Sequence, residues 1–145
     1  MIGASPERCF DIARDVGAHV QSTVATGERP VGPITSGLLS LGDEVTWEAR
    51  HLGIRQRLTA RITVYERPRL FVDEMVTGAF AHFRHEHLFE PVGVDTRMTD
   101  VFDFRSPLGV LGRLADALFL KSYMTRFLSV RAAVLKKLAE RGAAA

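Results

Sequence analysis

Two histidines and two aspartates lie on segments whose inward positions are otherwise apolar. Asp73, His85, His87 and Asp100 fall in the same phase as neighbouring phenylalanines and methionines, so the period-two pattern of a half-buried strand turns all four toward the core. If the connecting turns are tight, antiparallel pairing places Asp73 opposite His85 and His87 opposite Asp100. A neighbouring carboxylate raises the pKa of an imidazole and fixes its tautomer, so such a pair can hydrogen-bond a carbonyl or transfer a proton. We therefore predict two acid–imidazole pairs, which are also the candidate catalytic groups if the protein is an enzyme.

Other interpretations of these side chains remain open. The aspartates and histidines can satisfy each other in the interior and contact no ligand. The spacing His85-x-His87 with a nearby carboxylate is also compatible with a metal site, but it lacks a third histidine. Neither a metal nor another cofactor is therefore predicted. The stretch 70–77 is apolar on both faces, so a register with Leu70, Val72 and Val76 inward is an alternative.

The elements that must position these groups form a long meander. From Asp43 to Arg105 apolar and polar residues alternate, and turn residues interrupt the pattern at Leu52-Gly53, Arg67-Pro68, Gly78 and Gly93. This pattern predicts antiparallel strands with one face in water and one face in the core.

Helical patterns stand on both sides of the meander. Ser5-Pro6-Glu7 is typical of a helix start, and a second short helix is expected after it. Between residues 25 and 42 the chain holds six glycines and prolines, so any strand there is irregular or at an edge. From Pro107 onward apolar residues recur at helical spacing, and we expect a bend near the end of the apolar run Leu108–Leu120.

The order of these elements resembles the START/SRPBCC superfamily, which has the birch-pollen-allergen-like helix-grip fold. The resemblance rests on the run Ser5–Asp11, the run Gly42–Trp47, Pro68 before an apolar strand, and Thr96–Asp100. It is greatest for the bacterial branch of polyketide cyclases/dehydrases and lipid-transport proteins. The fold class it implies is α+β, with residues 1–145 as a single domain in which a curved antiparallel sheet wraps around a long C-terminal helix. The first strand of the family is expected to be very short, or to begin upstream, because only four residues precede Ser5.

Members of this superfamily characteristically hold an apolar small molecule between sheet and helix, which implies a hydrophobic ligand such as a lipid, a quinone or a polyketide. The side chains expected to contact it are the inward residues of the meander and of the final helix. They are Trp47, Leu58, Ile62, Phe71, Asp73, Met75, Phe83, His85, His87, Phe89, Met98, Asp100, Phe102, Phe104, Leu118, Met124 and Phe127.

Composition narrows the class of protein further. The chain has 145 residues, a net charge of +2 and a single cysteine, which excludes a disulfide scaffold and gives no signature of nucleic-acid binding. No apolar stretch is long enough to span a membrane, so we predict a cytoplasmic protein. Three functions compete: a binding module, which is favoured, an enzyme of the cyclase or dehydratase type with a His–Asp pair, and an interaction module or homodimer using the apolar run Leu108–Leu120.

Overall fold

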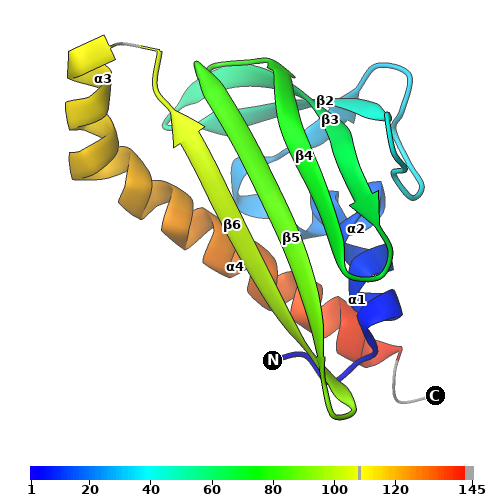
Figure 1. The fold of residues 1–145 in the computed structure, drawn as a ribbon. Coiled ribbons are helices and arrows are strands. Elements are labelled where there is room, and N and C mark those ends of the chain that lie inside the picture. The colour runs from blue at the N-terminus through cyan, green and yellow to red at the C-terminus, as the bar shows by residue number, and fades with distance from the viewer. Residues whose placement is uncertain (108, 143–145) are drawn as a thin grey trace.

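An antiparallel sheet and a long C-terminal helix on its inner side form the protein (Figure 1). The computed structural model describes residues 1–107 and 109–142, so Leu108 of the predicted apolar run lies outside the described residues. The helices are α1 (Pro6–Ala13), α2 (Val16–Ser22), the 3-10 helix η1 (Val24–Thr26), α3 (Gly109–Ala115), the π-helical η2 (Asp116–Leu120) and α4 (Lys121–Arg141). The strands are β1 (Arg29–Val31), β2 (Glu44–His51), β3 (Ile54–Glu66), β4 (Leu70–Thr77), β5 (His82–Val92) and β6 (Asp95–Arg105).

The six strands follow one another in the sheet in chain order, and every neighbouring pair is antiparallel. This confirms the predicted meander and the α+β helix-grip class. The short β1 is the edge strand expected from the Gly- and Pro-rich segment. Ahead of α1, pairing with the sheet is reduced to one bridge between Ile2 and Thr96, as the prediction of a shortened first strand requires.

The sheet curves because β3 is irregular. Its pairing with β4 shifts register between Thr59 and Ala60 and again between Ile62 and Val64. Such bulges bend a strand and reverse the parity of the residues that follow. The alternation in the sequence predicts Val64 inward, but beyond the second shift Tyr65 packs against the core cluster instead.

Two turns set the strand registers at one end of the sheet. Leu52-Gly53 is the predicted two-residue turn, in which both residues have positive φ, 53° and 79°, and glycine tolerates this conformation best. The connection between β4 and β5 was expected to contain three residues, but it contains the four residues 78–81. The pairing of these strands ends at Glu74 and Arg84, so the expected pairing of Met75 with Phe83 does not form.

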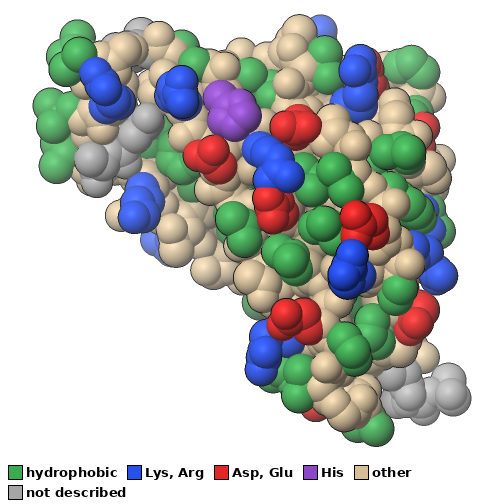
Figure 2. All heavy atoms as spheres, viewed as in Figure 1, with side chains coloured by type: hydrophobic (Ala, Val, Ile, Leu, Met, Phe, Trp, Pro, Cys, Tyr) green, Lys and Arg blue, Asp and Glu red, His purple; other side chains and the backbone are tan. Residues whose placement is uncertain are grey.

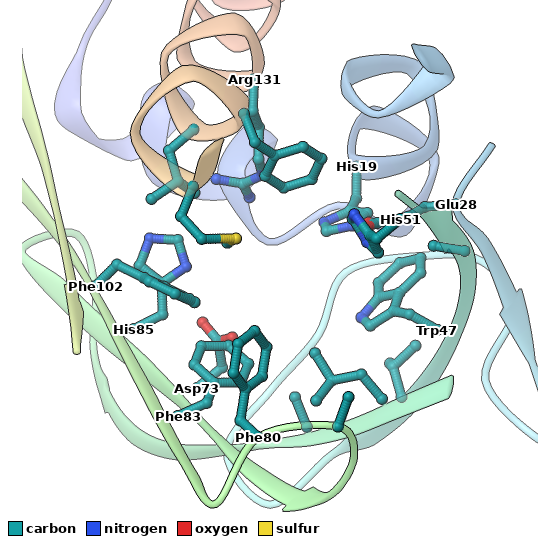
Figure 3. Close-up of a pocket in the computed structure, with 18 of the residues that line it drawn as sticks. His19, Glu28, Trp47, His51, Asp73, Phe80, Phe83, His85, Phe102 and Arg131 are labelled. Atoms are coloured by element: carbon teal, nitrogen blue, oxygen red, sulfur yellow. The ribbon is translucent and has the colours of Figure 1, made fainter. Parts of the chain in front are cut away.

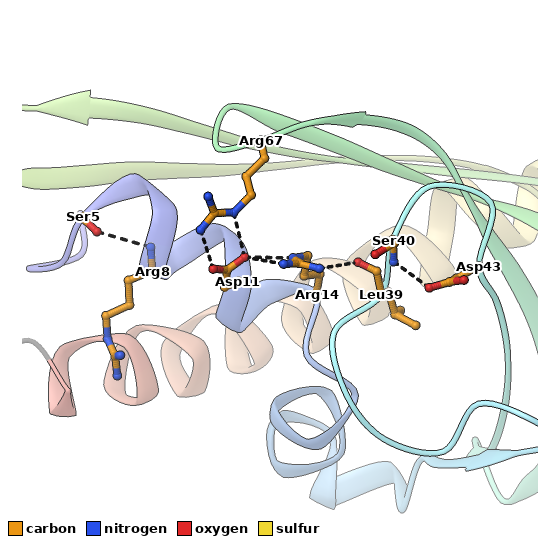
Figure 4. Close-up of polar contacts among 8 residues, drawn as sticks. All are labelled: Ser5, Arg8, Asp11, Arg14, Leu39, Ser40, Asp43 and Arg67. Atoms are coloured by element: carbon orange, nitrogen blue, oxygen red, sulfur yellow. Dashed lines mark hydrogen bonds and ion pairs between the residues drawn. The ribbon is translucent and has the colours of Figure 1, made fainter.

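Polar contacts anchor the N-terminal helices and the following loop (Figure 4). The Ser5 hydroxyl accepts a hydrogen bond from the Arg8 amide at 3.4 Å and caps α1. Asp11 accepts hydrogen bonds from Arg14 and Arg67, and Arg14 Nη1 donates to the Leu39 carbonyl at 2.8 Å. The loop before β2 is thereby fixed against α1.

The C-terminal helix follows the expected pattern only in part. Its α-helical geometry is interrupted at η2, where the bend was expected. Within α4 the buried residues are Met124, Arg131, Leu135 and Ala139. Val130 stands at helical spacing from Phe127 and Val134, which predicts that it faces inward, but it is 50% exposed. The true buried stripe is therefore displaced around the helix from the one the apolar residues suggested.

The outer surface of the sheet carries mixed charges. Figure 2 shows acidic and basic side chains interspersed with hydrophobic ones over the strands, as expected for the face in water. Within residues 1–107 and 109–142, no helix is long and apolar enough to span a membrane.

Candidate functional site

A cavity of about 290 Å³ lies between the sheet and α4 (Figure 3). Its wall combines aromatic and aliphatic side chains with a few charged ones. Of the residues predicted to bind a ligand, those that line it are Trp47, Leu58, Ile62, Phe71, Asp73, Phe83, His85, His87, Phe102, Met124 and Phe127. Because Phe71 and Asp73 line the cavity, β4 has the predicted register in which Asp73 faces inward, and not the alternative with Leu70, Val72 and Val76 inward.

The other predicted residues do not line the cavity. Phe89 and Met98 belong to the core cluster around α1, beyond the cavity's end. Met75 and Phe104 lie outside the lining, toward the end of the sheet where β4 and β5 separate. Leu118 is 73% exposed because α3 and η2 project past the sheet (Figure 1).

Asp100, the last predicted residue, lies behind the lining and contacts both histidines. His85 Nε2 lies 3.0 Å from Asp100 Oδ1, and His87 Nε2 lies 2.7 Å from Asp73 Oδ1. His87 Nδ1 is 2.9 Å from Asp100 Oδ1, without hydrogen-bond geometry. The predicted strand register is confirmed, but the predicted pair of Asp73 with His85 is wrong, because the side chains lean diagonally across the strands. The four groups form one network and not two pairs.

The pKa values of the two imidazoles in this network are shifted in opposite directions, although their ring centres are 3.8 Å apart. Burial lowers the pKa of His85 to about 4, and the charge of His87 acts in the same direction. Burial also acts to lower the pKa of His87, but Asp100 and Asp73 outweigh it and raise that pKa. Near neutral pH His85 is therefore uncharged, and His87 is the imidazole that takes the proton more readily.

Among the residues that the structure describes, Asp73, His85 and His87 form the group that could hold a metal ion. Their ligand atoms all lie within 4.8 Å of one another. The hydrogen bonds to Asp100 and Asp73 already account for this arrangement, and the cation of Arg131 lies 3.9 Å from Asp100 Oδ1. The chemistry of the set fits a polar network better than a metal centre.

A second polar cluster, which the sequence analysis missed, lies on another part of the wall. Glu28 contacts the Nε2 atoms of both His19 and His51, the latter at 3.4 Å. His51 Nδ1 is 2.8 Å from the Tyr123 hydroxyl, and His19 stacks on Trp47 with ring centres 3.9 Å apart. Burial acts to raise the pKa of Glu28, but the two imidazoles outweigh it and lower the pKa to about 2. Glu28 is therefore ionised at neutral pH.

Arg131 is the second group that the sequence analysis missed. It projects from α4 into the cavity with its side chain only 5% exposed (Figure 3). Its Nη2 donates to the Ala13 carbonyl at 3.4 Å. Its Nε and Nη1 have no hydrogen-bond partner among the described residues.

Comparison with known families places this architecture. Residues 1–141 match the family described as polyketide cyclase / dehydrase and lipid transport. The protein belongs to this family. The match confirms the resemblance seen in the sequence, and no curated protein matches the chain.

Solved structures share the fold of this polyketide cyclase/dehydrase and lipid-transport family member. TTHA0849 from Thermus thermophilus is 17% identical, with a TM-score of 0.76, over 94% of this chain and 90% of that one. A START superfamily protein from Mycobacterium smegmatis is 18% identical, with a TM-score of 0.70, over 97% and 92%. The major latex-like protein 151 from Panax ginseng is 14% identical, with a TM-score of 0.69, over 95% and 91%. At these identities the likeness shows the helix-grip fold alone.

Different signals were available for the missed residues of this family member. Arg131 stands seven residues after Met124 and four before Leu135, so helical spacing alone puts it on the buried stripe. For the second cluster no local signal exists. His19 is on α2, Glu28 just before β1, and His51 at the end of β2, so that only the tertiary fold brings them together.

Proposed function

We propose that this protein binds a hydrophobic small molecule in the cavity between the sheet and α4. The observation that supports the proposal is the cavity itself: about 290 Å³, walled largely by apolar side chains, with charged groups at a few places. Ligand sites of proteins have this composition, since apolar area supplies affinity and a few polar groups fix orientation. The family to which the chain belongs includes lipid-transport proteins, which is consistent with this function.

Filling the cavity tests the proposal. Ala49 is 7% exposed and lines the cavity, whereas Ala133 is an exposed residue of α4. Ala49→Leu should occupy part of the space and weaken binding at least tenfold, and the same change at Ala133 should leave binding unchanged. Native mass spectrometry of protein purified without detergent detects a co-purified ligand, and fluorescence of the single tryptophan, Trp47, reports occupancy of the wall. Equal binding by both variants would contradict the proposal.

One observation favours a second candidate, an enzyme of the cyclase or dehydratase type. Asp73, His85 and His87 line the cavity, and the two imidazoles differ in the direction of their pKa shifts. A pair of titratable groups held apart in this way can divide the roles of base and acid, with His85 accepting a proton and His87 donating one. In this candidate, Asp73→Asn and His87→Gln abolish turnover of a polyketone while the melting temperature stays within a few degrees of wild type. Loss of activity and stability in equal measure would favour a structural role.

A further inference from the structure

Arg131 is a buried cation that has a carboxylate nearby but lacks hydrogen-bond acceptors for most of its N–H groups. Its side chain is 5% exposed, and its nearest carboxylate oxygen, Asp100 Oδ1, lies 3.9 Å from Nη1. That oxygen already forms a hydrogen bond with His85 Nε2 and lies 2.9 Å from Nδ1 of His87. The hydrogen bond of Arg131 to the Ala13 carbonyl is long at 3.4 Å, and it is the only one that its side chain makes to the described residues. Two of its three nitrogens therefore reach no acceptor among the described residues.

A buried donor without an acceptor is costly, and a guanidinium has five N–H groups to satisfy. Figure 3 shows the Arg131 side chain extending toward the open space of the cavity, on the side of Phe102 and His85. An oxygen atom of a bound molecule would supply what the chain itself does not.

The other charges around the cavity decide what kind of oxygen fits. Glu28, Asp73 and Asp100 are carboxylates whose pKa values lie below their usual values. Against these three stand the cations of Arg131 and, when protonated, His87. The rings of His19 and His51 contact Glu28, and burial lowers the pKa of His19, so that this ring adds no positive charge at neutral pH. Burying a further negative charge among them is unfavourable, because like charges repel strongly where water is excluded.

The remaining charged groups of the lining do not change this balance. Arg14 and Arg57 also line the cavity, but each is paired with an acid away from the inner network. Arg14 lies 2.7 Å from Asp11 and Arg57 lies 2.9 Å from Glu48. Asp43, the other charged residue of the lining, adds a further carboxylate.

We propose that Arg131 donates hydrogen bonds to an uncharged carbonyl oxygen of the ligand, so that the cavity selects ketones, esters or amides and rejects carboxylates of the same shape. This inference rests on the proposed binding function and adds the residue and the ligand chemistry that give it specificity. Such a cavity would bind neutral carbonyl compounds and exclude free fatty acids, whose carboxylate oxygens carry a negative charge.

Three ligands of one skeleton test the proposal on the wild-type protein at pH 7, followed by Trp47 fluorescence. They are 4-phenylbutan-2-one, 3-phenylpropanoate and isopentylbenzene, whose terminal groups are a ketone, a carboxylate and an isopropyl group of similar shape. The ketone should bind about ten- to a hundred-fold more tightly than the hydrocarbon, because one hydrogen bond from a charged donor is gained. It should also bind at least tenfold more tightly than the carboxylate.

Arg131→Met should remove the preference for the ketone over the hydrocarbon. Arg126→Met is the matched control, since Arg126 is an exposed residue of the same helix. If Arg131→Met does not fold, the wild-type series with three ligands still decides the ligand class. Tighter binding of the carboxylate than of the ketone would overturn the ligand class.

Equal binding of ketone and hydrocarbon would overturn the role of Arg131 and leave the proposed function intact. Binding of none of the three would overturn both.

Discussion

Replacing Glu28 with Gln removes a buried charge while keeping the shape of the side chain. Glu28 is 10% exposed and contacts the rings of His19 and His51. Although burial acts to raise its pKa, these contacts lower it from 4.5 to about 2. At 1.36 kcal/mol per pKa unit this shift corresponds to about 3 kcal/mol of stability. A glutamine supplies no charge to the two rings and can turn only one oxygen toward them.

The pH dependence of this effect has a definite sign. Because the pKa of Glu28 is lower in the folded state, its contribution is fully present above pH 4.5 and is lost as the pH falls toward 2. Glu28→Gln should therefore lower the free energy of unfolding by up to about 3 kcal/mol at pH 7, and by less than the full shift because burial lowers the pKa of His19 and leaves that ring uncharged there. The deficit relative to wild type should shrink progressively below pH 4.5.

Urea denaturation followed by far-UV circular dichroism at several pH values measures this difference. Glu44→Gln is the control, because Glu44 pairs with Arg61 at an exposed position and such pairs contribute about 0–1 kcal/mol. A Glu28→Gln protein as stable as wild type at pH 7 would refute the reasoning. So would a deficit that does not change with pH.

Two further predictions concern the first network and the core. Burial lowers the pKa of His85 to about 4, so between pH 6.5 and pH 4 the unfolded chain takes up a proton that the folded histidine does not, and the wild-type protein loses stability. His85→Gln should make this loss smaller by up to about 3 kcal/mol. Identical pH profiles from denaturant titrations of variant and wild type would contradict this. Leu135→Ala should cost about 2–5 kcal/mol because Leu135 is 1% exposed, while Val130→Ala, at a position 50% exposed, should stay within about 0.5 kcal/mol; thermal unfolding of the two variants decides which stripe of α4 is buried, and the reverse order would show that the sequence-based stripe was correct.

The strand pattern and its registers were predictable because they depend on local rules. Alternation placed Asp73, His85 and His87 on the inner face, and all three line the cavity. Turn residues gave the pairing of His87 with Asp100 and of Asp73 with His85 along the backbones. Prediction failed where a local irregularity intervened, at the bulges of β3 and at the four-residue connection before β5.

What the sequence determined by itself is the fold class, the order of the strands and the face on which most of their side chains lie, because a period of two follows from the backbone alone. The tertiary structure decided which side chains meet. Diagonal contacts in place of direct ones set the partners of His85 and His87, and the projection of α3 past the sheet exposed Leu118. Glu28 and Arg131 acquired their surroundings only when separate segments closed around one cavity, since burial and charge at a point in space depend on every element that reaches it.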